Sequence, residues 1–249
     1  MAAFDRPTVA ARPGTAAVID EGLRSYMLKV YNYMSIGLVV TGLVAYFTYT
    51  MSFVETAGGL GLTQFGAAIY QSPLQWVVML APLAFVLVLS FGINKLSTGT
   101  AQLLFWVFAA VMGVSLSSIF AVYTGGSIAK VFFISAAMFG GMSLYGYTTK
   151  RDLTKIGSFL VMGLWGLIIA SVVNIFWPSG PLGFAISIVG VVVFLGLTAW
   201  DTQKIKEGYD VNHSVETLSK GAIMGALSLY LDFLNLFLML LRLMGQQRN

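Results

Sequence analysis

The sequence predicts an all-α integral membrane protein with seven transmembrane helices. Of its 249 residues, 57% are hydrophobic and only 10% are charged, whereas about a quarter of the residues of a soluble domain are charged. The chain also divides into seven apolar runs of roughly 20 residues, the length at which a helix crosses about 30 Å of hydrocarbon. We therefore expect a single polytopic domain in a lipid bilayer, and no nucleic-acid partner.

The expected helices follow from the apolar runs in order. Residues 1–24 combine Ala, Pro and charged residues without apolar periodicity, which indicates a flexible tail ahead of a transmembrane domain at 25–249. The first run lies behind four basic residues and lacks a small-residue cleavage site, so we interpret it as an uncleaved span. The seven spans are expected at residues 30–50, 76–94, 101–123, 128–148, 156–177, 182–201 and 219–243.

The basic residues predict the orientation of the chain in the membrane. With a cytoplasmic N-terminus, all of the 14 basic residues except Lys130, Arg242 and Arg248 lie on the cytoplasmic side. Because short cytoplasmic loops carry an excess of Lys and Arg, this distribution predicts a cytoplasmic N-terminus and, for seven spans, an external C-terminus. Arg242 and Arg248 would instead be cytoplasmic if the last segment were re-entrant.

Acidic residues within the spans are the strongest functional signal. Of the ten acidic residues, eight fall in the tail or in predicted loops, and only Asp201 and Asp232 lie at or within spans. A carboxylate at that depth usually faces a partner, a water-filled cavity or a transport pathway. The two aspartates are therefore the candidate site residues.

Periodicity predicts that the two aspartates meet. On the last helix, residues at steps of three or four form one small and polar face: Gly221, Gly225, Ser228, Asp232, Asn235, Met239 and Arg242. On the sixth, the corresponding stripe is Gly183, Ser187, Gly190, Phe194, Thr198 and Asp201. Small residues let helices approach closely, so we expect these two stripes to pack together. We interpret the glycines of "GAIMG" at 221–225 in the same way, as internal packing and not a dimer face.

An aspartate pair has a specific chemistry. Two adjacent carboxylates share a proton and titrate as a coupled pair, so they sense pH. When ionised they offer hard oxygen ligands of the type that Ca²⁺ prefers, and Ser228 and Asn235 could supply supporting polar groups. The alternative is that Asp201 only caps its helix or pairs with Lys204 or Lys206 at the membrane edge. We expect no resident cofactor and no enzymatic activity.

Three segments carry a family resemblance. "TAWDTQKIKEGY", followed by "ALSLYLDFLNLFLMLLRLMG", resembles the end of the Bax inhibitor-1 family, and "GYTTKRDLTKIGSFLVMGLWGLIIASVVNIF" is similar to its bacterial members. The resemblance implies a bacterial inner-membrane protein with six helices around a central last helix. It also implies a pH-sensitive calcium leak pathway, with Asp201 and Asp232 as its latch. In such relatives an acid and an arginine on the second helix surround the latch, whereas this chain offers only Lys95 there.

Two other functions stay open at this point. The same resemblance includes bacterial proteins that modulate a membrane-bound quality-control protease and eukaryotic proteins that oppose cell death, so the chain could be a regulator that acts through partners. One catalytic aspartate on each of two consecutive helices is also the arrangement of intramembrane aspartyl proteases. Those enzymes carry Gly-x-Gly-Asp at the second aspartate, and this chain has "LYLD". Ion flux, with Ca²⁺ or H⁺ as the ion, is thus the expectation that the residues favour.

Overall fold

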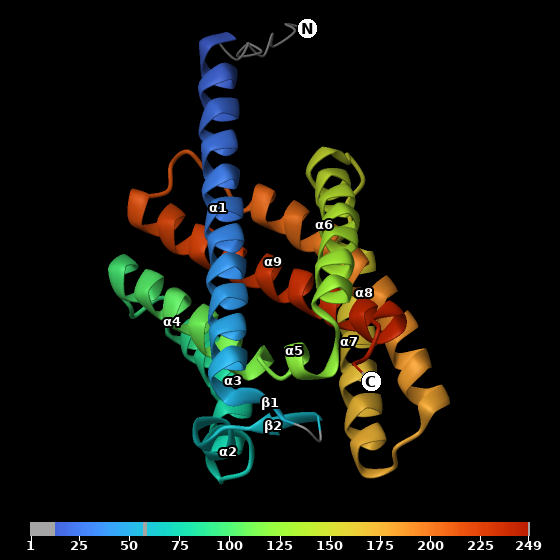
Figure 1. Ribbon diagram of the computed structural model, residues 1–249. Helices are drawn as coiled ribbons and strands as arrows, with labels where there is room; N and C mark the ends of the chain where they lie inside the picture. The colour runs from blue at the N-terminus through green and yellow to red at the C-terminus, as the bar shows by residue number, and fades with distance from the viewer. Residues whose placement is uncertain (1–12, 57–58, 249) are drawn as a thin grey trace, which may run out of the picture.

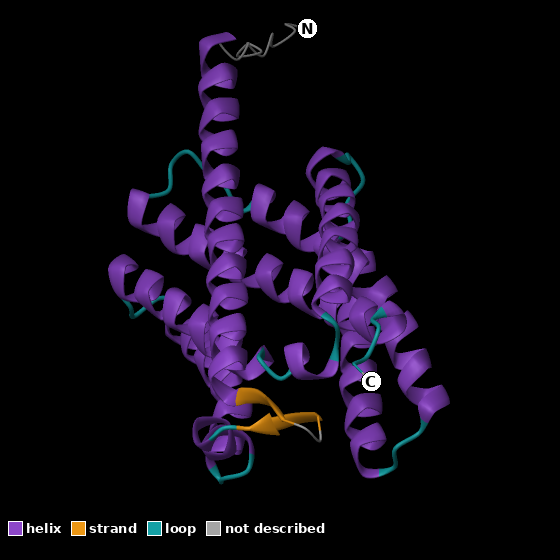
Figure 2. Ribbon diagram, viewed as in Figure 1, coloured by secondary structure: helices purple, strands orange, loops and turns teal. Residues whose placement is uncertain are grey.

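The computed structural model describes residues 13–56 and 59–248, and it is dominated by helices (Figure 2). Figure 1 shows their arrangement. In chain order the elements are α1 (Pro13–Ser52), β1 (Phe53–Thr56), β2 (Gly59–Leu62), α2 (Gln64–Tyr70), α3 (Leu74–Gly92), α4 (Thr98–Leu116), α5 (Ile119–Val122), α6 (Gly125–Thr148), α7 (Thr154–Phe176), α8 (Gly180–Glu207) and α9 (Val215–Met244).

The prediction of seven membrane-spanning helices is confirmed. Seven helical segments of the described chain are long and apolar enough to cross a membrane, and the shortest has 19 residues. They are 20–52, 74–92, 98–122, 125–148, 154–176, 180–207 and 215–244, so α4 and α5 together form one segment. The antiparallel hairpin β1–β2 and the short α2 fill the connection between the first two spans.

Two predicted boundaries differ from the structure. The helix α1 begins at Pro13, so the predicted boundary of the tail at residue 24 lies inside a helix, while the rest of that tail, 1–12, is outside the described residues. Proline is favoured in the first turn of a helix because its missing N–H needs no partner there. The helix α8 continues to Glu207, six residues beyond the predicted end at 201.

The helix α9 is central, as predicted. It packs against α8, α1, α6 and α4, and 67% of its most apolar window is buried, more than for any other span. By contrast, α3 packs mainly on α4 and α2, and α7 packs on α8. Four helices therefore surround α9 closely, while α3 and α7 lie outside this inner group and pack on other helices.

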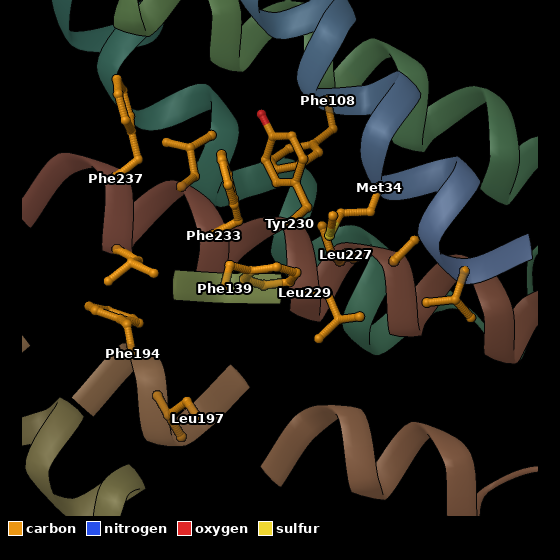
Figure 3. Close-up of a cluster of buried hydrophobic side chains, with 14 of the residues drawn as sticks. Met34, Phe108, Phe139, Phe194, Leu197, Leu227, Leu229, Tyr230, Phe233 and Phe237 are labelled. Atoms are coloured by element: carbon orange, nitrogen blue, oxygen red, sulfur yellow. The ribbon is translucent and has the colours of Figure 1, made fainter. Parts of the chain in front are cut away.

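Aromatic side chains fill the core beside α9 (Figure 3). The fully buried Tyr230 packs edge-on against Phe108, with ring centroids 5.2 Å apart. Its hydroxyl oxygen lies 2.6 Å from Oγ1 of Thr41, so α1 satisfies the one polar atom of this side chain. One turn further on, Phe233 packs edge-on against Phe139 of α6. These contacts fix the rotation of α9 within the bundle.

The glycine stripes are points of close helix approach. A Cβ atom at Gly225 would lie 3.2 Å from the side chain of Ile205 on α8, and one at Gly221 would lie 3.0 Å from the Tyr26 hydroxyl. A Cβ at Gly190 of α8 would lie 2.8 Å from Met239 of α9. The predicted stripes of the sixth and last helices thus meet, and the glycines at 221 and 225 pack inside the bundle.

A proline in α3 is compensated from the neighbouring helix. Pro82 lies inside α3 and has no N–H to donate to the carbonyl of Val78 four residues earlier. Oγ of Ser115 on α4 lies 2.5 Å from that carbonyl oxygen, and 3.1 Å from the carbonyl oxygen of Val111 in its own helix. A backbone carbonyl without a donor is costly in hydrocarbon, so this contact ties α3 to α4.

Candidate functional site

The two aspartates are brought together by α8 and α9. Asp201 lies within α8, and Asp232 lies near the middle of α9. Their carboxyl groups face each other within hydrogen-bonding reach. Two neighbouring carboxyl groups favour holding one proton between them, because two adjacent negative charges repel each other.

The environment of Asp232 requires such a proton. Its side chain is only 6% exposed, and within the described part of the chain no hydroxyl, amide or amine group donates to its Oδ2. Burying an ionised carboxylate without a hydrogen bond is far more costly than burying a neutral polar group. The carboxyl group of Asp201 is the group placed to satisfy it.

The pair lies in the wall of a large cavity. The cavity has a volume of about 1350 Å³ and is bounded by α3, α4, α7, α8 and α9. The predicted polar face of α9 contributes Ser228, Asp232, Asn235 and Met239 to its lining. Its titratable or charged lining groups are Asp201, Asp232, Lys204 and Tyr70, and the remaining lining is mainly apolar.

The structure places Lys204, and not Lys95, near the pair. Lys95 follows α3 in an exposed turn and does not line the cavity. The side chain of Lys204 lines it, and its Nζ lies 5.1 Å from the centroid of the Trp200 ring. Lys204 is three residues after Asp201, a spacing that puts both on one helix face, and the sequence had suggested it as an edge partner of Asp201.

Capping of a helix end by Asp201, one form of the edge alternative, does not fit this arrangement, whereas Lys204 lies near enough to act on the charge of Asp201. The helix α8 runs six residues beyond Asp201, so this carboxyl group does not cap its end. Lys206 instead donates from Nζ to the carbonyl oxygen of Tyr147, 2.8 Å away. In the described ranges, 13–56 and 59–248, neither Lys204 nor Lys206 has a carboxylate oxygen within 4.0 Å.

The donor set around the pair is small. Nδ2 of Asn235 donates to the carbonyl oxygen of Leu231 at 2.8 Å, and Asn235 also lines the cavity. Ser228 lines the same wall one turn before Asp232. Among the residues that the structure describes, no third acidic, histidine or cysteine side chain joins the two aspartates. Because Ca²⁺ takes six to eight oxygen ligands, a cation here would keep much of its hydration.

The loop acids are unsuited to sensing pH near neutrality. Hydrogen bonds from the side chain and backbone of Thr154 lower the pKa of Asp152, and the backbone N–H of Asn212 lowers the pKa of Asp210. Both groups therefore remain ionised near pH 7. The exposed His213 lies in the loop between α8 and α9 and does not line the cavity.

Comparison with known proteins agrees with this architecture. The family described as inhibitor of apoptosis-promoting Bax1 matches residues 23–249. The chain belongs to the Bax inhibitor family. The resemblance carried by its last three spans is thus confirmed, and it extends over nearly the whole chain.

Bacterial relatives match this family member along almost their full length. The chain is 50% identical to an uncharacterized protein of Rickettsia prowazekii, over 92% of this chain and 93% of the relative. It is 47% identical to the inner membrane protein YbhL of Escherichia coli K12, over 91% and 94%. An uncharacterized membrane protein of Streptococcus pyogenes is 33% identical, over 91% and 95%. This family member is a multi-pass membrane protein.

Proposed function

We propose that the protein is a pH-sensitive cation leak channel or exchanger whose substrate is Ca²⁺. The observation that carries this proposal is the carboxyl pair of the half-buried Asp201 and the buried Asp232 in the wall of the large cavity. The name of the relative YbhL supports an inner-membrane location, and the basic residues favour a cytoplasmic N-terminus.

The chemistry of the pair supplies the gate. With a shared proton, Asp201 and Asp232 hold α8 and α9 together and present little negative charge to a cation. Without that proton they repel each other and form a pair of hard oxygen ligands beside Ser228 and Asn235. The aspartate pair therefore binds either the shared proton or a cation, but not both at once. This competition is what a pH-sensitive leak or an exchange of protons for cations requires.

The cavity supports a route for a hydrated ion. Its lining extends from Tyr70 and Gln75, near the β1–β2 side of the bundle, to Lys204, near the opposite end of the spans. Both aspartates lie close to the Lys204 end. An ion that enters from the Tyr70 side would meet the pair before it leaves the bundle. The positive charge of Lys204 at that exit would then act on the passing ion.

Ca²⁺ flux from purified protein in liposomes tests the proposal. The proposal predicts a leak well above that of protein-free liposomes and of liposomes holding Asp232→Leu, which removes the carboxyl group. A protein that regulates a membrane protease or a stress response through partners would be silent in this assay. Cleavage of a membrane peptide by the wild type, lost in both aspartate variants, would instead indicate an aspartyl protease.

A further inference from the structure

The two residues that follow Asp201 on α8 point away from the cavity. Asp201 and Lys204 line the cavity, whereas Thr202 and Gln203 do not. Both of these side chains are buried, with exposed fractions of 0% for Thr202 and 6% for Gln203. Polar side chains buried to this extent need hydrogen-bond partners. Those partners lie on α6, on α1 and in the connection between α6 and α7.

The amide group of Gln203 binds the backbone of the connection between α6 and α7, residues 149–153. Its Oε1 accepts from the backbone N–H of Leu153 at 2.8 Å, and its Nε2 donates to the carbonyl oxygen of Arg151 at 2.8 Å. Two hydrogen bonds from one planar amide allow it one orientation, because each bond is directional. They therefore hold α8 at a fixed height and rotation relative to this connection.

Thr202 belongs to a chain of hydroxyl groups that reaches α6 and α1. Its Oγ1 lies 3.0 Å from Oγ of the buried Ser143 on α6, and that oxygen lies 2.5 Å from the hydroxyl oxygen of Tyr31 on α1. The backbones of α6 and α8 are close at the same level, because a Cβ atom at Gly146 would overlap the carbonyl group of Ala199. A rotation of α8 at this level would break the hydroxyl chain.

The contact of α8 with α9 at this level is less directional. Ile205 of α8 packs against Gly225 of α9, which is an apolar contact. Packing of this kind sets how closely two helices approach, but it does not select one rotation as a hydrogen bond does. The direction in which Asp201 points is therefore determined mainly by the elements on the other side of α8.

We propose that Thr202 and Gln203 are positioning residues of the carboxyl pair, which hold Asp201 in line with Asp232 by fixing α8 to α6 and to the 149–153 connection. When the deprotonated carboxyl groups repel each other, α8 then stays with α6 and α7, and the helices separate at the contact between α8 and α9. The consequence for gating rests on the function proposed above, whereas the alignment itself can be measured without ion flux.

Crosslinking between the two aspartate positions tests the alignment directly. The chain contains no cysteine, so Asp201→Cys combined with Asp232→Cys introduces one thiol on α8 and one on α9. This parent protein lacks both carboxyl groups, so the hydrogen bond of the pair cannot align the helices. We expect a short bifunctional thiol reagent to join the two positions within one chain in liposomes.

Substitutions in the parent protein then remove the hydrogen bonds of the two positioning residues. Thr202→Val and Gln203→Met keep the size of each side chain, and each should slow crosslinking about ten-fold, which corresponds to about 1.4 kcal/mol. Thr202→Ser keeps the hydroxyl group and should crosslink at the parent rate. The matched controls are Thr148→Val, at an exposed threonine of α6 that donates to its own helix, and Gln102→Met, at a half-buried glutamine of α4. Both should leave the rate unchanged.

The same substitutions in the protein that keeps both aspartates connect the alignment to gating. Thr202→Val should move the pH midpoint of Ca²⁺ flux toward acid, because a misaligned pair holds its shared proton less tightly, and Thr148→Val should not. Lys204 and Tyr70, the other titratable groups that line the cavity, are the same in all these proteins. The expected crosslinking rates without flux in any protein would contradict the proposed function and still support the positioning role.

Three results would overturn the positioning role. A parent protein that does not crosslink would show that the carboxyl pair aligns itself. Crosslinking as fast in Thr202→Val and Gln203→Met as in the parent would show that apolar packing alone aligns the helices. Equal slowing in Thr148→Val and Gln102→Met would show a general loss of structure. If Gln203→Met fails to fold, the comparison of Thr202→Val with Thr202→Ser still decides.

Discussion

Asp232 lies in the central helix, where a carboxyl group is stable only if a partner satisfies it. The residues around it meet that need through α8, which brings the carboxyl group of Asp201 within hydrogen-bonding reach. Ser228 and Asn235, one turn to either side on the same face, keep this wall of the cavity polar. The sequence predicted both aspartates because acids inside apolar helices are rare and need a reason.

Gly225 should be sensitive to any large side chain. A Cβ at this position already lies 3.2 Å from Ile205, so Gly225→Leu forces α8 and α9 apart. We expect a loss of about 1–3 kcal/mol of stability, as for other overpacked cores, measured by thermal unfolding in detergent. Gly166→Leu is the control, because a Cβ at Gly166 has no atom within 4 Å. Equal stability of the two variants would mean that α8 and α9 are not closely packed at Gly225.

At the scale of elements, the existence of the helices was predictable and their ends were not. Apolar runs of sufficient length identify spans, but charged residues at the membrane edge do not end a helix. The apolar run of the sixth span ends at about 201, whereas α8 continues past Lys204 and Lys206 to Glu207. The basic side chains lie over Trp200 and Tyr147, which lets the helix extend past the hydrocarbon.

The helix α3 should depend on a hydroxyl group from α4. Ser115→Ala removes the donor to the Val78 carbonyl, which Pro82 leaves without an intrahelical partner. An unsatisfied carbonyl of this kind costs about 1–3 kcal/mol, so thermal stability in detergent should fall. Ser158→Ala serves as the control, since this exposed serine only donates to the Thr154 carbonyl of its own helix. A Ser115→Ala protein as stable as the Ser158→Ala protein would show that another group satisfies Val78.

For the whole molecule, most of the described basic residues lie at one end. The loops that hold Lys95, Lys150 and Arg151 lie at the same end as the start of α9, where Lys29 donates to Ser219. At the other end, the Arg248 backbone N–H donates to the Val122 carbonyl at 2.9 Å, and its guanidinium group contacts Tyr49. The continuous α9 connects these ends, which argues against a re-entrant last segment.

This distribution predicts a topology that reporter fusions can check. Fusions at the N-terminus and in the 149–153 loop should report a cytoplasmic position, and a fusion after residue 249 should report an external one. A matched fusion in the 177–179 connection should also be external, because α7 ends there. A cytoplasmic C-terminus together with a cytoplasmic N-terminus would contradict seven complete crossings.

The cavity could not be predicted from the sequence. Periodicity shows which face of a helix is polar, but not how far a helix stands from its neighbours. The polar face of α9 was predicted from residues 221–242, whereas the gap in front of it results from α3 and α7 packing on other helices. For the same reason Lys204 was considered only as an alternative edge partner of Asp201, and Lys95 only as the basic residue that the second span offers.

The pH profile of Ca²⁺ flux in proteoliposomes tests the central claim most directly. Wild-type flux should change across roughly pH 5–8, the range that a buried carboxyl pair can reach. Asp201→Asn and Asp232→Asn should each flatten or shift that profile, and the double variant should add little, because coupled residues are not additive. His213→Gln, which alters the single histidine outside the cavity, should leave the profile unchanged. Flux that persists in both aspartate variants with the wild-type pH profile would contradict the account, and Asp232 would then be a structural residue of the central helix.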